Sequence, residues 1–176
     1  MTRVILITGT RKGIGKYLAE YYLERGDFVA GCSRSEASIN NPNYFHSNCD
    51  VTNDNDVAKF TRSVKRKWGR VDVLINNAGI ASMNHILTMP SKKASQIIQT
   101  NFIGTFNFVR EVSKIMISQK KGRIVNMSTV AVPMNLSGEA VYAASKSAVE
   151  SFTRIAAFEL GEFGITINTL APTPTE

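Results

Sequence analysis

Short runs of apolar residues alternate along this chain with stretches in which apolar positions recur every three or four residues. Residues 4–7 are continuously apolar, and residues 71–75 are apolar apart from Asp72. Runs of this kind are typical of parallel strands that are buried on both faces. Residues 124–125 and 165–170 complete this series of predicted strands.

The segments between these runs have helical spacing. The apolar positions are Ile14/Leu18/Tyr22, Val57/Phe60/Val64, and several within residues 93–119. Thr52 is predicted to cap the second helix. Because repeated strand-then-helix units pair their strands in parallel through right-handed crossovers, the pattern predicts an α/β fold, a doubly wound parallel β-sheet with helices on both faces. Ligands on such sheets bind beyond the carboxyl ends of the strands.

Length and composition fit one globular domain over residues 1–176, since the chain is 43% hydrophobic and 20% charged. No repeat or linker divides it, and residues 40–43 are interpreted as a loop of ordinary length. No apolar stretch approaches the ~20 residues that a membrane span needs. We therefore expect a cytoplasmic protein that makes no contact with a membrane.

A glycine-rich loop follows the first predicted strand: Thr8-Gly9-Thr10-Arg11-Lys12-Gly13-Ile14-Gly15. Glycines let the backbone turn sharply and approach a pyrophosphate, and the start of the next helix offers free N–H groups. The spacing differs from GxGxxG, and such turns also serve simply as tight turns. The order strand, loop, helix favours a nucleotide site.

Residues 8–15 match TGxxxGxG, and in this the chain resembles the classical short-chain dehydrogenase/reductase family. The resemblance implies a Rossmann-type NAD(P)-binding fold and extends from residue 8 to about residue 175. It also covers Asp50-Val51, where it implies an adenine contact from Asp50, and Asn77-Ala78-Gly79 after the fourth strand. A simple asparagine–glycine turn is the alternative interpretation of the last motif.

Local charge at the end of the second strand favours NADP(H) over NAD(H). A binder of NAD normally carries an acid there to accept from the ribose 2′-hydroxyl. Here Ser33 and Arg34 occupy that place, and Arg34 together with Lys12 could neutralise a 2′-phosphate. Glu36 is a nearby acid that complicates this interpretation. The predicted cofactor-binding residues are Gly9, Arg11, Lys12, Gly13, Ile14, Gly15, Ser33, Arg34, Asp50, Val51, Asn77, Ala78, Gly79, Tyr142, Lys146 and Pro172.

Tyr142 and Lys146 form a YxxxK motif in a predicted helix, which places the phenol and the ammonium one turn apart on the same face. A nearby cation favours the ionised form of a phenol. We therefore predict that Tyr142 donates a proton to a carbonyl oxygen during reduction and removes one during alcohol oxidation. The resemblance implies that Lys146 also bonds the nicotinamide ribose.

The catalytic hydroxyl is the one departure near these residues. The family has a serine thirteen positions before the tyrosine, where this chain has Thr129, which follows Ser128. Spacing favours Thr129, and a bulge in the loop would favour Ser128. The resemblance further implies that Asn101 holds a water that relays protons from the lysine.

The C-terminal end resembles the family's PG motif after the sixth strand, with Pro172 kept and Thr173 in place of glycine. By the resemblance, members continue into substrate-binding helices and a last strand that this sequence lacks. Either it is part of a longer enzyme or the protein is naturally short.

Other features predict less chemistry. The net charge is +7, with a basic stretch that we interpret as a solvated helix face rather than a nucleic-acid site: Lys59, Arg62, Lys65, Arg66, Lys67 and Arg70. Cys32 and Cys49 are predicted to be reduced thiols, and with His46 and His85 they form no metal-ligand cluster. Both histidines are interpreted as structural or exposed, and a place at the substrate mouth is the alternative interpretation of His85. The resemblance implies a homodimer or homotetramer through the helices around Asn101 and Tyr142.

The sequence therefore predicts an NADP(H)-dependent oxidoreductase that interconverts a carbonyl and a secondary alcohol on a small-molecule substrate. The identity of that substrate lies beyond the sequence. The alternative is a catalytically impaired nucleotide-binding or interaction protein that retains the fold, an interpretation motivated by Thr129 and by the absent C-terminal part.

Overall fold

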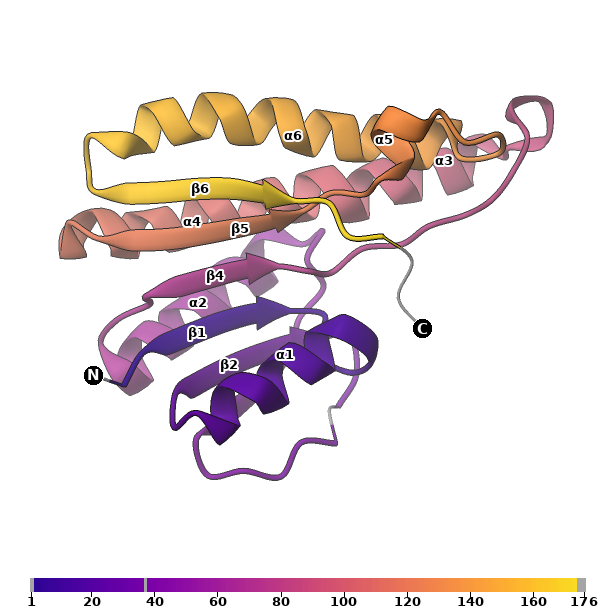
Figure 1. Cartoon of the computed structure of the whole chain (residues 1–176). Coiled ribbons are helices and arrows are strands. Elements are labelled where there is room, and N and C mark those ends of the chain that lie inside the picture. The colour runs from indigo at the N-terminus through magenta and orange to yellow at the C-terminus, as the bar shows by residue number, and fades with distance from the viewer. Residues whose placement is uncertain (1, 37, 174–176) are drawn as a thin grey trace.

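The computed structural model describes residues 2–36 and 38–173 and contains a six-stranded sheet in the order β3-β2-β1-β4-β5-β6, with every neighbouring pair parallel. The sheet twists across the middle of the molecule in Figure 1. Its strands are β1 (Val4–Thr8), β2 (Phe28–Ser33), β3 (Tyr44–Asn48), β4 (Val73–Asn76), β5 (Gly122–Met127) and β6 (Ile165–Leu170).

Alternate residues of β1 face the two sides of the sheet, and each side is buried by helices. Ile5 and Ile7 pack with Ala19 and Leu23 of α1 (Gly13–Glu24) on one side. Val4 and Leu6 face the larger core on the other. The predicted α/β fold with helices on both faces is therefore confirmed.

Three helices supply the larger core. They are α2 (Asp54–Trp68), α4 (Gly104–Gln119) and α6 (Ala140–Gly161). Phe60 of α2 and Phe108 of α4 meet edge to face with ring centroids 6.3 Å apart, and Ala156 brings α6 against the same cluster. Both phenyl rings are fully buried, so they fix how these helices lie on the sheet.

Shorter elements connect the strands and helices near the carboxyl edge. After β4 come the 3₁₀ turn η1 (Ile86–Thr88) and α3 (Ser91–Ile98), and a π-helical turn, η2 (Gln99–Ile103), joins α3 to α4. The short helix α5 (Ala131–Met134) lies between β5 and α6. The predicted helical segment 93–119 is thus a helix interrupted by η2. None of the helices in the described ranges is long and apolar enough to cross a membrane.

One local expectation needs correction, and one strand was not expected. The residue that caps α2 is Asn53, whose side chain accepts from the N–H groups of Asn55 and Asp56 at 3.0 and 3.3 Å. Thr52 instead bonds Asp50, so it does not cap the helix. The strand β3 was not predicted from the pattern, although its pairing with β2 runs over its whole length.

The strand order reverses direction between β1 and β4, which are neighbours although helices and two strands separate them in the chain. The chain runs from β1 to α1 on one face of the sheet and from β4 to α4 on the other, and ligands of doubly wound sheets bind in a crevice at such a point. The glycine-rich loop after β1 and the asparagine-rich loop after β4 both start at this point.

Candidate nucleotide and catalytic site

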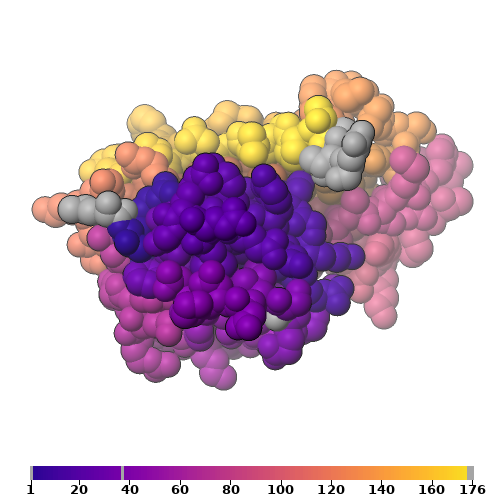
Figure 2. All heavy atoms as spheres, turned by 60° about the horizontal axis from the view of Figure 1, so that its bottom comes forward, coloured from indigo at the N-terminus to yellow at the C-terminus, as the bar shows by residue number. Residues whose placement is uncertain are grey.

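A cavity of about 1020 Å³ opens at the carboxyl ends of the strands, where the sheet order reverses. Of the residues predicted to bind the cofactor in the segments 9–15, 33–34, 50–51 and 77–79, all but Gly15 line it. In Figure 2 the surface is hollowed between the indigo residues near the start of α1 and the pink segment around α3. The structure thus brings together residues from four separate loops.

Gly15 does not line this cavity but packs closely against the two loops that do. A Cβ added to it would overlap the carbonyl oxygen of Gly9 and the side-chain nitrogen of Asn77. That Asn77 nitrogen donates to the carbonyl oxygens of Thr8 and Gly9, at 2.9 and 3.4 Å. The loops after β1 and β4 are therefore held together by hydrogen bonds from the Asn77 side chain to backbone carbonyls. The packing around these bonds leaves no room for a side chain at Gly15.

The cavity wall is strongly cationic. Among the described residues that line it, five side chains carry positive charge and one carries negative charge: Arg11, Lys12, Arg34, Lys92 and Lys93 against Asp50. The Asp50 carboxylate already accepts from the backbone N–H and the hydroxyl of Thr52, both at 2.9 Å. The free charge of this wall suits a ligand with several phosphate groups.

Lys92 and Lys93 were missed in the sequence, as were Gln96, Gln99 and Thr100, which share the same face of the α3–η2 segment and also line the cavity. Their spacing of three to four residues was a signal that they share one helix face. The spacing did not show that this helix face and the glycine-rich loop after β1 line the same cavity.

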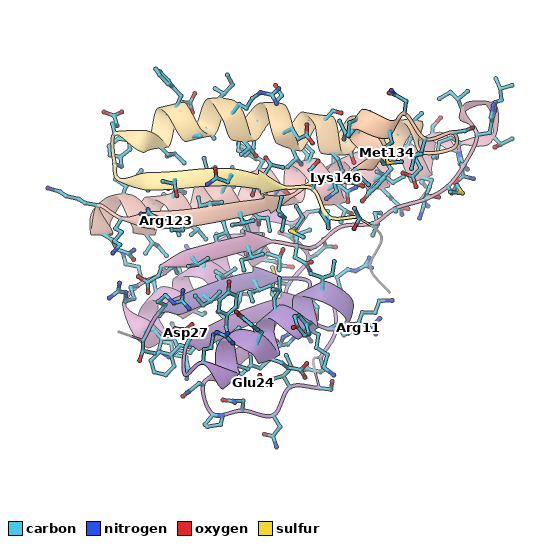
Figure 3. All side chains as sticks on the ribbon, viewed as in Figure 1. Arg11, Glu24, Asp27, Arg123, Met134 and Lys146 are labelled. Carbon is cyan, nitrogen blue, oxygen red and sulfur yellow. The ribbon has the colours of Figure 1, made fainter. Side chains whose placement is uncertain are left out.

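A smaller cavity of about 190 Å³ adjoins the first, with Ile14, Asn77, Gly79 and Ile80 common to both. Tyr142, Lys146 and Pro172 line the smaller cavity only. Figure 3 shows Lys146 below α6, close to the ends of β5 and β6, and Arg11 at the same end of the sheet. The predicted acid–base residues thus face a chamber next to the cationic one.

Lys146 is a buried cation with 5% of its surface exposed. Its Nζ donates to the carbonyl oxygen of Met127 at 2.6 Å. Burial lowers the pKa of Lys146 to about 8, because desolvation disfavours the charged form. The side chain remains mostly protonated at neutral pH, yet it can lose its proton in mildly alkaline solution.

The two candidate hydroxyls differ in how they are bonded. The buried Ser128 lines the smaller cavity, but its Oγ donates to Oε1 of Glu150 at 2.5 Å. The half-buried Thr129 accepts from the N–H of Ala131 at 3.2 Å. Accepting does not use the proton of Thr129, whereas the proton of Ser128 is engaged.

Asn101 lies in η2 and is fully buried. Its Oδ1 accepts from the N–H of Ile80 at 2.8 Å, and its Nδ2 donates to the carbonyl of Ile80 and to Oγ of Ser145, both at 2.9 Å. It therefore ties the loop after β4 to α6 one residue before Lys146. π-Helical turns occur frequently at functional sites.

The remaining charged and histidine side chains lie elsewhere. His85 is exposed and caps η1, and it lines neither cavity. The six basic residues of the 59–70 stretch are all exposed. Cys32 and Cys49 are free and buried. In the described ranges no three His, Cys, Asp or Glu side chains gather closely enough to hold a metal ion.

The crevice where the strand order reverses, the glycine-rich turn and the cationic wall define a dinucleotide-binding α/β protein. Residues 3–176 match the family model described as short chain dehydrogenase, and the chain belongs to that family of oxidoreductases. It is 36% identical over 176 residues to the 3-oxoacyl-[acyl-carrier-protein] reductase FabG of Vibrio cholerae, covering 97% of this chain and 72% of that protein.

Solved structures agree with this assignment. ElxO with NADP bound superposes with a TM-score of 0.93 at 32% identity, covering 98% of this chain and 74% of that one. NAD+-bound xylitol dehydrogenase has a TM-score of 0.90 at 29% identity, covering 97% and 70%. These similarities support a nicotinamide cofactor.

Proposed function

We propose that the protein is an NADP(H)-dependent oxidoreductase that interconverts a carbonyl and a secondary alcohol. The observation that carries the proposal is the pairing of two adjoining cavities, one lined by five cations and the other by Tyr142 and Lys146. The first suits a phosphorylated dinucleotide, and the second suits proton transfer beside it.

The residues present fit such a cofactor. A Cβ at Gly79 would lie 3.3 Å from Oδ1 of Asn101 and 3.5 Å from Nζ of Lys146, so a side chain there would crowd Asn101 and would be in contact with Lys146. The glycine leaves room for a flat ring above the backbone. The loop at residues 9–14 would hold the pyrophosphate, and Lys12 and Arg34 would meet a 2′-phosphate.

A bound nicotinamide supplies the two-electron chemistry. Tyr142 then gives a proton to the substrate oxygen, or takes it in the reverse direction. Lys146 would keep a positive charge near the phenol and would be the residue that holds the ribose, while Asn101 fixes the loop at Ile80 against α6. We assign the orientation of the substrate carbonyl to Thr129, because no group among the described residues engages its hydroxyl proton, although the neighbouring Ser128 and not Thr129 lines the smaller cavity.

The relatives support a choice of cofactor and substrates to test. ElxO was solved with NADP and xylitol dehydrogenase with NAD+, and FabG is named for reduction of 3-oxoacyl groups on acyl carrier protein. In this chain Arg34 stands where an NAD binder has an acid, which favours NADP(H).

The test is fluorescence titration with NADPH and NADH, followed by a turnover screen of 3-oxoacyl thioesters and simpler ketones. We expect tighter binding of NADPH than of NADH, and we expect NADPH oxidation that Tyr142→Phe abolishes while the variant still binds NADPH. Binding without turnover of any substrate would support the alternative, a nucleotide-binding protein without catalysis. Tighter binding of NADH would contradict the roles of Arg34 and Lys12.

A further inference from the structure

A row of hydrogen-bonded side chains connects the glycine-rich loop to the turn that carries Arg34. Oγ1 of Thr10 lies 2.8 Å from Oη of Tyr44, and that Oη lies 2.9 Å from Nδ1 of His46. On its other side, Nε2 of His46 lies 3.1 Å from the carbonyl oxygen of Ser35 and 3.3 Å from Oγ of Ser33. The histidine therefore bridges β3 and the end of β2.

The directions of these bonds follow from the one group that can only accept. The Ser35 carbonyl requires a proton on Nε2, so Nδ1 of a neutral ring must accept from Tyr44. Tyr44 then accepts from Thr10, which is fully buried. Burial raises the pKa of Tyr44 to about 12, so its phenol keeps the proton that it donates to His46.

The packing of β2 is adapted to this row. A Cβ at Gly31 would overlap Oη of Tyr44 and would lie 2.5 Å from Oγ1 of Thr10. The glycine thus lets a tyrosine from β3 cross β2 and reach the loop after β1. Gly9 and Thr10 are fixed to the same strand through their N–H groups, which donate to the carbonyl of Cys32 at 2.8 and 3.2 Å.

The far end of the row holds the turn at Ser33, Arg34 and Ser35, all of which line the large cavity. Arg34 is exposed, so its guanidinium depends on the backbone of the turn for its position. The Ser35 carbonyl that follows it accepts from His46 and also from the hydroxyl of Ser33. A donor at His46 thereby restrains the backbone on the C-terminal side of Arg34.

We propose that His46 is a positioning residue that sets the cofactor preference, by holding the Ser33–Ser35 turn so that Arg34 meets the 2′-phosphate of NADP(H). The inference rests on the proposed function and extends it to a residue that touches no cofactor. A histidine that only stabilised the fold would affect NADPH and NADH equally. A histidine that positions Arg34 affects only ligands that carry the 2′-phosphate.

The experiment measures dissociation constants for NADPH, NADH, 2′,5′-ADP and 5′-ADP by calorimetry. For His46→Ala we expect on the order of tenfold weaker binding of NADPH and 2′,5′-ADP, and less than about twofold change for NADH and 5′-ADP. His46→Gln, whose amide can donate to the Ser35 carbonyl, restores most of the loss. His85→Ala is the matched control and leaves all four constants unchanged.

A double-mutant cycle tests the route through Arg34. If His46 acts on this side chain, His46→Ala adds little to the loss that Arg34→Ala causes alone. Full additivity, or equal weakening of NADPH and NADH by His46→Ala, overturns the inference and leaves the proposed function intact. Tyr44→Phe, which removes the link to Thr10 but keeps the Ser35 bond, provides the same comparison if His46→Ala does not fold, and we expect a smaller loss from it. Failure of the wild-type protein to bind any nicotinamide nucleotide overturns both.

Discussion

Lys146 illustrates how a single residue can be costly for stability and needed for chemistry. Its ammonium is buried against the carbonyl of Met127, and within residues 2–36 and 38–173 no acidic side chain contributes to its lowered pKa. A buried cation without a counterion raises the free energy of the folded state. Because the pKa falls from 10.5 to about 8, this cost at neutral pH amounts to about 3 kcal/mol.

Replacing this lysine should therefore stabilise the protein. Between pH 8 and 10.5 the unfolded chain binds more protons than the folded one, so wild-type stability rises with pH across that window. We expect Lys146→Met to raise the melting temperature at pH 7, to lose this advantage near pH 10, and to abolish turnover. Thermal unfolding across the pH range measures this, with Lys65→Met on the exposed face of α2 as the control. A lower melting temperature for Lys146→Met at pH 7 would contradict the account.

The choice between Ser128 and Thr129 is also decided at the residue scale. Thr129→Ala should lower kcat by about 10²-fold or more, because a donor to the substrate oxygen is lost. Ser128→Ala leaves the carboxylate of Glu150 without its partner, and it should lower stability with a smaller effect on kcat. Steady-state kinetics and thermal unfolding of both variants separate the roles. The reverse pattern would assign the catalytic hydroxyl to Ser128.

At the scale of elements, the start of α2 depends on one side chain. Asn53→Ala removes the acceptor for two N–H groups and should cost about 1 kcal/mol, which lowers the melting temperature by roughly 2–4 °C. Asn55→Ala makes the same change two residues later, in the first turn of α2. It removes no cap and serves as the control. Equal destabilisation by both changes would show that the cap bond contributes nothing.

The elements that could be predicted from sequence are those whose burial appears as a local pattern of apolar residues. β1 and α1 have uninterrupted apolar patterns, and the glycines between them predict a loop. β3 has no such apolar pattern, because it is a half-buried edge strand containing His46 and Asn48. Its order comes from pairing with β2, which is a non-local interaction.

The residues of the site also fall into those that could be predicted from sequence and those that depend on tertiary contacts. The residues that follow β1 and β4 could be predicted to meet, because the carboxyl ends of neighbouring parallel strands share one edge. Lys92 and Lys93 could not, since their place depends on how the π-helical turn η2 joins α3 to α4 and on the tertiary bonds of Asn101. The hydrogen bonds of His46 could not be predicted either, because Ser33 and Ser35 lie at the end of another strand and in the turn that follows it.

At the scale of the whole molecule, the outer side of α6 exposes apolar side chains. Phe158 and Ile155 are 90% and 61% exposed. Beside them, Phe152 of α6 stacks edge to face with Phe102 and Phe106, with ring centroids 6.0 and 6.1 Å apart. Exposed patches of this kind mark interaction surfaces.

We expect a homodimer formed through α4 and α6. Phe158→Glu should shift the protein to monomers in sedimentation velocity, because a charge would enter the apolar interface. Met83→Glu changes an apolar side chain that is 76% exposed in the loop after β4, and as the control it should leave the dimer intact. A monomeric wild-type protein at micromolar concentration would refute the expectation.

The imbalance of five cations to one acid in the large cavity has a kinetic consequence as well. Such a wall attracts anions over distances of about a Debye length, roughly 10 Å at 0.1 M salt, before any contact forms. Stopped-flow measurement should therefore find an association rate for NADPH that falls steeply as ionic strength rises. The double change Lys92→Glu and Lys93→Glu should flatten that slope and slow capture, while the rate of escape changes little. The two lysines of α3 would then govern how quickly each turnover can begin when the cofactor is scarce.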